Sequence, residues 1–143
     1  MNKGITIEKS IQINATPAEV WDVITNPAKV KQYMFGTDMT ADWNVGGKIT
    51  YKGEWDGKKY EDGGTILEIE PKKILKSTYW SSMSGTPNTP ENQMVVTYKL
   101  ESKDGGTLMT VIQDNNKTEA GAEHSGENWG MVLDSMKKIA ENS

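Results

Sequence analysis

His124 is the one side chain in this 143-residue sequence whose ordinary pKa lies near neutrality. Glu127 follows it at i+3, so on a helix the imidazole and the carboxylate share a face and could act as an acid–base pair or as two metal ligands. A solvated helix start with ordinary charges is the alternative interpretation. Because the spacing provides no third ligand, we predict no metal, and His124 stays the single catalytic candidate.

The composition removes several other kinds of chemistry. Cysteine is absent and all 16 basic residues are lysine, against 20 acidic residues and a net charge of −4. The sequence therefore has no thiolate nucleophile, no cysteine-ligated metal and no guanidinium fork for phosphates or guanine edges, and we predict no nucleic-acid partner. We interpret the glycine pairs at 46–47, 63–64 and 105–106 as turn glycines at strand starts or hairpins, because none precedes a helix as a phosphate-binding loop does. No cofactor is predicted.

The sequence contains many aromatic residues and methionines that could line a binding pocket. Five tryptophans and five tyrosines accompany a single phenylalanine, and there are eight methionines. They would form either a pocket with apolar walls and polar tips or an ordinary core. Five indole N–H groups that each need a partner favour the pocket for the set as a whole. The predicted ligand-binding residues are Trp43, Tyr51, Trp55, Trp80, Met94, Tyr98, Asn128, Trp129 and Val132.

The elements that position these residues begin with a strand from Gly4 to Ile13, in which isoleucines alternate with polar residues. Lys9 falls on the apolar parity of this strand. A bulge or a twist toward the sheet edge explains the break, and a lysine directed into an interior space is the alternative.

Two short helices are predicted next. Thr16-Pro17-Ala18-Glu19 is a capping box with proline at the first helical position, and Asn26-Pro27 ends that helix and starts a second one, which Gly36 terminates.

Residues 37 to about 114 alternate as in an antiparallel sheet. Met94, Val96, Tyr98 and Leu100 share one parity, and the connections are too short for parallel crossovers, so we predict a meander of five or six strands. The expected strand segments include Ile49–Trp55, Thr65–Ile69, Ile74–Trp80, Met94–Glu101 and Thr107–Gln113, with a hairpin at Asp56-Gly57 and a long loop over Ser81–Asn92.

The chain closes with a predicted amphipathic helix from about Ala122 to Glu141, whose apolar stripe includes Trp129, Val132 and Leu133. The order of elements predicts an α+β fold in one domain, 1–143, with a curved sheet wrapped around the last helix. No signal peptide or membrane-spanning run is apparent, so we expect a cytoplasmic protein with no membrane partner.

Several phrases, in this order, resemble the helix-grip proteins of the START and birch-pollen-allergen superfamily (SRPBCC). Within that superfamily the chain is similar to the family named for the activator of the heat-shock protein 90 ATPase. The matching phrases are Ala15-Thr16-Pro17-Ala18-Glu19-Val20-Trp21 with Thr25-Asn26-Pro27, Asp42-Trp43-Asn44-Val45-Gly46-Gly47, Tyr60-Glu61-Asp62 to Glu70-Pro71, Tyr79-Trp80-Ser81, Gly106-Thr107-Leu108, and Asn128-Trp129 with Leu133.

The resemblance implies a cavity between the sheet and the C-terminal helix that commonly holds apolar small molecules, but it implies no single chemistry. Our first hypothesis is non-catalytic binding of a small apolar or amphipathic molecule in that cavity. The second is a cyclase- or hydrolase-type enzyme that uses His124 or a buried acid on a substrate in the same cavity. The third is a chaperone or stress-response partner, which needs an exposed apolar patch of several hundred Å².

Overall fold

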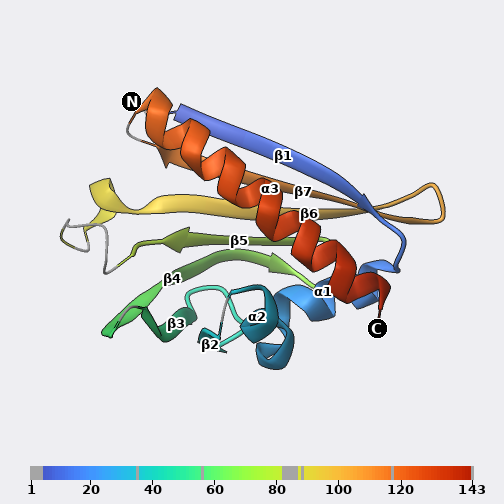
Figure 1. The fold of residues 1–143 in the computed structure, drawn as a ribbon, viewed down its shortest axis with the longest axis horizontal. Coiled ribbons are helices and arrows are strands. Elements are labelled where there is room, and N and C mark those ends of the chain that lie inside the picture. The colour runs from blue at the N-terminus through green and yellow to red at the C-terminus, as the bar shows by residue number, and fades with distance from the viewer. Residues whose placement is uncertain are drawn as a thin grey trace.

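The computed structural model describes residues 5–34, 36–55, 57–81, 87, 89–116 and 118–142. Over these residues the chain forms one antiparallel sheet of seven strands, in the order β1-β7-β6-β5-β4-β3-β2, with a long helix across one face (Figure 1). This is the predicted α+β helix-grip fold. The elements are β1 (Ile5–Ile13), α1 (Pro17–Thr25), α2 (Pro27–Tyr33), β2 (Asp38–Ala41), β3 (Lys48–Trp55), β4 (Lys58–Glu70), β5 (Ile74–Tyr79), the 3₁₀ turn η1 (Pro90–Asn92), β6 (Met94–Lys103), β7 (Gly106–Asn116) and α3 (Glu119–Glu141).

The two short helices form for the local reasons that the sequence indicates. The Thr16 hydroxyl accepts the Glu19 N–H at 3.2 Å and the Glu19 carboxylate accepts the Thr16 N–H at 2.9 Å, which is a complete capping box. Asn26 both ends α1 and caps α2, because its side chain accepts the Ala28 N–H at 3.0 Å. Gly36 then adopts a left-handed φ of 89°. Both predicted helices and their starting residues are confirmed, and α2 ends at Tyr33, three residues before the predicted stop at Gly36.

The irregularity expected at Lys9 lies elsewhere in β1. Its pairing with β7 is continuous from Ile7 to Ile13, and the register shifts between Ile5 and Ile7. Lys9 pairs with Val111 on the face that α3 covers, and its Cε lies 3.2 Å from where a Cβ on Gly126 would stand. Since Lys9 is exposed, its aliphatic stem covers the helix backbone at this glycine while the residue still reaches solvent.

The glycines at 63–64 are not turn residues, contrary to the sequence interpretation. Both lie inside β4, which begins at Lys58, seven residues before the predicted Thr65. A Cβ on Gly63 would lie 2.2 Å from the Ile49 carbonyl oxygen, and one on Gly64 would lie 1.8 Å from that of Thr78. Glycine is therefore required because the strands on both sides approach β4 too closely for a side chain.

Helix α3 begins at Glu119, three residues before the predicted start, because the Thr118 hydroxyl accepts the Gly121 N–H at 2.9 Å and caps the helix. Its second half buries Leu133, Met136 and Ala140 against the core formed by the sheet and the two short helices. No helix in the described part of the chain combines the length and apolarity needed to cross a bilayer.

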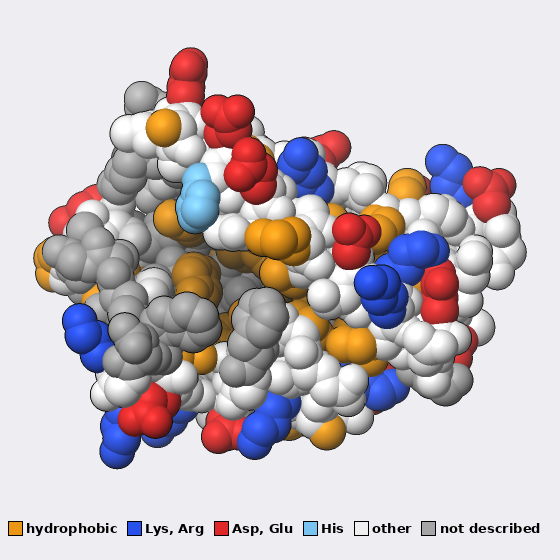
Figure 2. Space-filling view, viewed as in Figure 1, with side chains coloured by type: hydrophobic (Ala, Val, Ile, Leu, Met, Phe, Trp, Pro, Cys, Tyr) orange, Lys and Arg blue, Asp and Glu red, His pale blue; other side chains and the backbone are white. Residues whose placement is uncertain are grey.

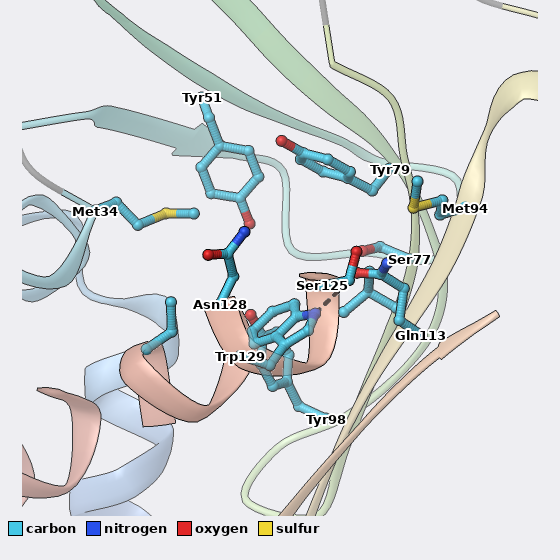
Figure 3. A pocket seen from close by; sticks show the side chains of 12 residues that line it. Met34, Tyr51, Ser77, Tyr79, Met94, Tyr98, Gln113, Ser125, Asn128 and Trp129 are labelled. Carbon is cyan, nitrogen blue, oxygen red and sulfur yellow. Dashed lines mark hydrogen bonds between the residues drawn. The ribbon is translucent and has the colours of Figure 1, made fainter. Parts of the chain in front are cut away.

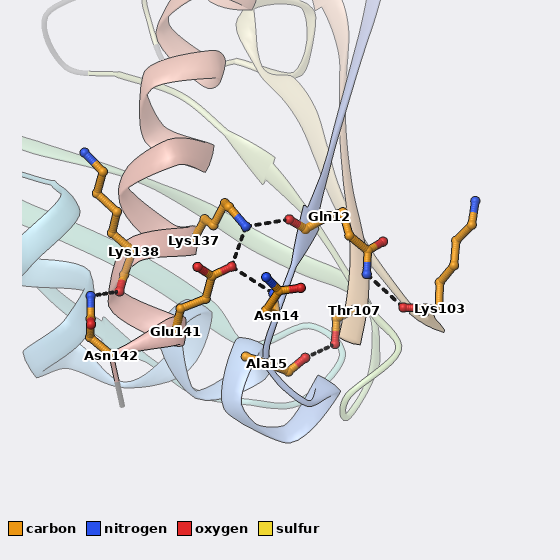
Figure 4. A network of polar contacts seen from close by, with 9 residues as sticks. All are labelled: Gln12, Asn14, Ala15, Lys103, Thr107, Lys137, Lys138, Glu141 and Asn142. Carbon is orange, nitrogen blue, oxygen red and sulfur yellow. Dashed lines mark hydrogen bonds and ion pairs between the residues drawn. The ribbon is translucent and has the colours of Figure 1, made fainter. Parts of the chain in front are cut away.

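A polar network fastens the end of α3 to the end of β1 (Figure 4). The Lys137 ammonium donates to the Gln12 carbonyl at 3.0 Å and pairs with the Glu141 carboxylate, which also accepts the Asn14 N–H at 2.8 Å. These contacts, led by the one with Lys137, hold the pKa of Glu141 below its ordinary value. The C-terminal half of α3 is thus held by burial and by paired charge at once.

Gly130, at the middle of α3, can be replaced by a larger residue without a clash. A Cβ on Gly130 meets no atom within 4 Å. We expect Gly130→Ala to raise the free energy of unfolding by about 0.5–1 kcal/mol, since alanine loses less backbone entropy in a helix. Gly64→Ala, the contrasting variant, is expected to lower it by about 3 kcal/mol through overpacking. Urea unfolding measures both, and equal effects of the two substitutions would contradict this account.

The Glu141 network predicts a defined pH dependence. Because the folded-state pKa of Glu141 is lowered, the native protein binds fewer protons than the unfolded chain as the pH falls below the ordinary value of 4.5. We expect Glu141→Gln to be destabilising at pH 7 and the gap from wild type to close as the pH falls through that range. Unfolding midpoints at pH 7, 4.5 and 3 measure the gap. The exposed Glu101→Gln is the control, and a gap that persists unchanged at pH 3 would refute the charge-based explanation.

Candidate functional site

A pocket of about 360 Å³ lies between the sheet and the N-terminal half of α3. The space-filling view shows hydrophobic side chains at the bottom of a hollow on this face (Figure 2). Side chains from four strands, from α3 and from the end of α2 line it (Figure 3). They are Met34, Tyr51, Ser77, Tyr79, Met94, Val96, Tyr98, Gln113, Ser125, Asn128, Trp129 and Val132.

The sheet register brings the strand residues of this set together. Ser77 on β5 pairs with Val96 on β6, and Val96 pairs with Gln113 on β7, so the three side chains form a row across the sheet. Tyr79 pairs with Met94 in the next row toward the strand ends. Because paired residues in an antiparallel sheet point to the same face, both rows are directed at α3.

Trp129 connects α3 to the floor of the pocket. Its indole N–H donates to the Gln113 side-chain oxygen at 2.8 Å, and its ring meets Tyr98 edge to face, with centroids 5.7 Å apart and an interplanar angle of 80°. Gln113 is 5% exposed, so this bond satisfies polar groups that would otherwise be buried without a partner. The contact orients the indole as one fixed wall of the pocket.

A second aromatic pair forms the opposite wall and has a carboxylate behind it. Tyr51 and Tyr79 meet edge to face, with centroids 6.4 Å apart. The Tyr79 hydroxyl donates to one oxygen of Asp62 at 3.1 Å, and the Ser81 hydroxyl donates to the other at 3.0 Å. Asp62 sits directly opposite Tyr51 in the β3–β4 register, so the carboxylate is held close to the pocket wall without being part of its lining.

Burial keeps the tyrosines of the site in their neutral form. Desolvation raises the pKa of Tyr51 to about 12 and raises the pKa values of Tyr79 and Tyr98 as well, with the Asp62 charge adding to the effect on Tyr79. Buried Tyr33, on α2 nearby, shows the same direction. Their hydroxyls are therefore hydrogen-bond donors across the physiological pH range. Among the described residues that line the pocket there is no Asp, Glu, Lys or His.

The nine residues predicted to bind a ligand do not all lie at the pocket. Six of them line the pocket: Tyr51, Met94, Tyr98, Asn128, Trp129 and Val132. Trp43 packs against the hydrophobic core, and Trp80 forms a backbone pair with Gly63; neither is part of the lining. The Trp55 side chain lies outside the described residues, as do Asp56 and much of the predicted loop over Ser81–Asn92. Binding by any of the nine remains a prediction.

Sequence reasoning missed the other half of the lining, although part of it had a signal. Val96 lies between Met94 and Tyr98 on the same face of β6. On β5, Ser77 and Tyr79 share a face with the buried Leu75. On β5 these odd-numbered residues face the pocket, whereas the sequence interpretation put Trp80 there. Met34, Gln113 and Ser125 had no local signal, because only the approach of distant elements makes them neighbours.

His124 does not reach this site. It is exposed on α3 and is not part of the lining. The described residues contain no cluster of three or more histidine or acidic side chains that could hold a metal ion. The enzyme hypothesis therefore loses the residue on which it mainly rested.

The chain matches one protein family over most of its length. The family model described as activator of Hsp90 ATPase homolog 1-like protein matches residues 14–141. The chain belongs to this family. The resemblance in the sequence phrases is thereby confirmed, and the family's fold is the one described above.

Solved structures of similar proteins agree with this membership. A protein from Cytophaga hutchinsonii, ChR145, is 42% identical with a TM-score of 0.86, and the match covers 99% of this chain and 97% of that one. The Aha1 dimer from Colwellia psychrerythraea is 21% identical with a TM-score of 0.74, covering 96% of each chain. CalU16 from Micromonospora echinospora is 22% identical with a TM-score of 0.74, covering 94% of this chain and 75% of its own. The last two likenesses show the fold alone. Curated proteins give no match.

The buried tyrosines predict a loss of stability at high pH. Because their pKa values are raised in the folded state, the native protein keeps protons that the unfolded chain releases near pH 10, so stability is complete below pH 10 and falls as the pH rises above it. We expect Tyr51→Phe to make this fall less steep, by about 1.4 kcal/mol per pH unit between pH 10 and 12. Denaturant unfolding at several pH values measures the slope. Parallel slopes for the variant and the wild type would contradict the burial of Tyr51.

Proposed function

We propose that this chain binds a small apolar or amphipathic molecule in the pocket beneath α3 and does not transform it. The observation that carries the proposal is the 360 Å³ space walled by three tyrosines, a tryptophan and two methionines. Pockets of this size and lining are typical of small-molecule sites. Contact with the apolar walls would supply most of the affinity, at about 25 cal/mol for each Å² removed from water, and the hydroxyl and amide tips would orient the ligand.

The lining supports binding better than chemistry. Among the described residues of the lining, Ser77 and Ser125 have no histidine or carboxylate beside them that could act as a general base. Asp62 is a partly buried acid behind the pocket wall, and its two oxygens already accept bonds from Tyr79 and Ser81. With both oxygens engaged, the Asp62 carboxylate holds the Tyr79 ring in place.

A chaperone-binding surface has less support in the structure. Such a surface needs contiguous exposed apolar area. In the described ranges, the large hydrophobic side chains that stand out as exposed are Val45 in the loop before β3, Leu67 on β4 and Met131 on α3. The Val45 loop is joined to β4 next to Leu67, because the Gly46 N–H donates to the Ile66 carbonyl at 2.8 Å, whereas Met131 lies on α3. Three such side chains give less support to a partner surface than the lining gives to a binding pocket.

Filling the pocket tests the proposal directly. Ser77 lies on the floor of the pocket, and we expect Ser77→Phe to occupy the space and to abolish binding of the neutral fluorescent probe N-phenyl-1-naphthylamine. Wild type should bind it and show a raised melting temperature, because a ligand that binds only the native state stabilises it. Fluorescence titration and thermal unfolding measure the two effects.

The matched control is Ser10→Phe, which makes the same change on the exposed side of β1. It should bind the probe as the wild type does. Native mass spectrometry of the purified wild type, before and after solvent extraction, checks for a ligand that co-purifies. Equal probe binding by wild type and Ser77→Phe, or no binding of any apolar compound by wild type, would refute the proposal.

A further inference from the structure

We infer that the ligand of this pocket is uncharged and carries a hydrogen-bond-accepting oxygen, which the Tyr51 hydroxyl and the Asn128 amide receive from opposite walls. This inference rests on the proposed function and specifies the chemical class of the ligand. It follows from two independent features: where charge stands around the pocket, and which of its polar groups are already bonded.

The distribution of charge excludes an ionic ligand inside the pocket. The described part of the lining contains no cationic side chain, and the Asp62 carboxylate stands behind Tyr79, to which it is hydrogen-bonded. On α3 the neighbouring exposed side chains include Glu123 and Glu127, so a ligand anion would be desolvated without a counter-charge and would meet negative charge at the helix. Lys9 packs over Gly126, which is not part of the lining.

A ligand cation is disfavoured for a related reason. The one carboxylate near the wall already accepts bonds on both of its oxygens, from Tyr79 and from Ser81. A cation in the pocket would therefore have aromatic faces but no free anionic partner among the described residues of the lining, and the cost of desolvating a full charge exceeds what aromatic contact returns.

The hydrogen bonds divide the polar groups of the pocket into two kinds. The Trp129 N–H is donated to Gln113 and the Tyr79 hydroxyl to Asp62, so neither is available to a ligand. Within the part of the chain that the structure describes, no hydrogen bond is present for the hydroxyls of Tyr51, Tyr98, Ser77 and Ser125 or for the Asn128 amide. A donor that lines the pocket and bonds to none of the described protein groups favours a ligand that supplies the acceptor in place of water.

Two of these available groups face each other. Tyr51 comes from β3 and Asn128 from α3, and their polar ends point toward one another across the pocket (Figure 3). Burial holds the Tyr51 hydroxyl in its protonated, donating form, and an amide always donates. The edge-to-face pair of Tyr98 and Trp129 stands beyond them and offers its faces to a flat ring. An oxygen on such a ring would reach both donors.

Four probes that share one naphthalene ring separate these properties. They are 2-acetylnaphthalene with a neutral acceptor, 2-ethylnaphthalene with none, 2-naphthoate as the anion and 2-naphthylmethylammonium as the cation. An NMR titration that follows the Trp129 indole N–H at pH 7.5 measures the affinity of each. We expect the ketone to bind about tenfold more tightly than the hydrocarbon, as one or two neutral hydrogen bonds allow, and both ions to bind at least tenfold more weakly than the ketone.

Two phenylalanine variants then locate the recognition. Tyr51→Phe should reduce the preference for the ketone over the hydrocarbon to about twofold or less, while leaving the affinity for the hydrocarbon unchanged. Tyr79→Phe also removes one hydroxyl from the lining, but that hydroxyl is bonded to Asp62, so the preference should persist. Asn128→Ala, at an exposed position of α3, is expected to reduce the preference as Tyr51→Phe does and needs no change in the core.

The outcomes distinguish this inference from the proposed function. If the hydrocarbon and the ketone bind equally, or if either ion binds as tightly as the ketone, the ligand class is wrong and the binding function stands. If the preference survives both Tyr51→Phe and Asn128→Ala, the assignment of the two donors is overturned. If none of the four probes binds, the proposed function fails, and the present inference fails with it.

Discussion

The packing of α3 across the sheet is the constraint on which the rest of the structure depends. Its second half buries Leu133 and Met136 and is fastened to β1 through the pair of Lys137 and Glu141. Its first half meets the sheet through Trp129, whose N–H is bonded to Gln113 over a space that the other side chains do not fill. The C-terminal half of α3 thus packs on the core, and its N-terminal half covers the pocket.

Much of the fold could be predicted because its signals are local. The capping box at Thr16, the double role of Asn26 and the alternation around Tyr98 each depend on residues within one turn or one strand. The site was predictable only in part. Parity shows that Tyr51 and Tyr98 face inward, but it cannot separate a residue that lines a cavity from one, such as Trp43, that packs into the core. That difference depends on the distance between elements far apart in the chain.

The features that sequence reasoning placed wrongly have the same physical cause. The glycines at 63–64 have the composition of a turn, yet the carbonyls of Ile49 and Thr78 on neighbouring strands are what require them. Lys9 breaks an apolar pattern without a bulge, because a glycine on α3 leaves room for its stem. In each case the decisive contact lies more than ten residues away in the sequence. Local patterns indicate which secondary structure a residue favours, whereas contacts with residues distant in the sequence determine its position in the fold.

Family membership establishes the fold, and the bonding state of a few polar groups then determines what the pocket can receive. Tyr51 and Tyr79 are the same residue type on the same wall, but Asp62 engages only the hydroxyl of Tyr79. The carboxylate therefore holds one ring of the wall, and among the described residues it leaves the Tyr51 hydroxyl without a protein partner, which is the difference on which the proposed ligand class rests.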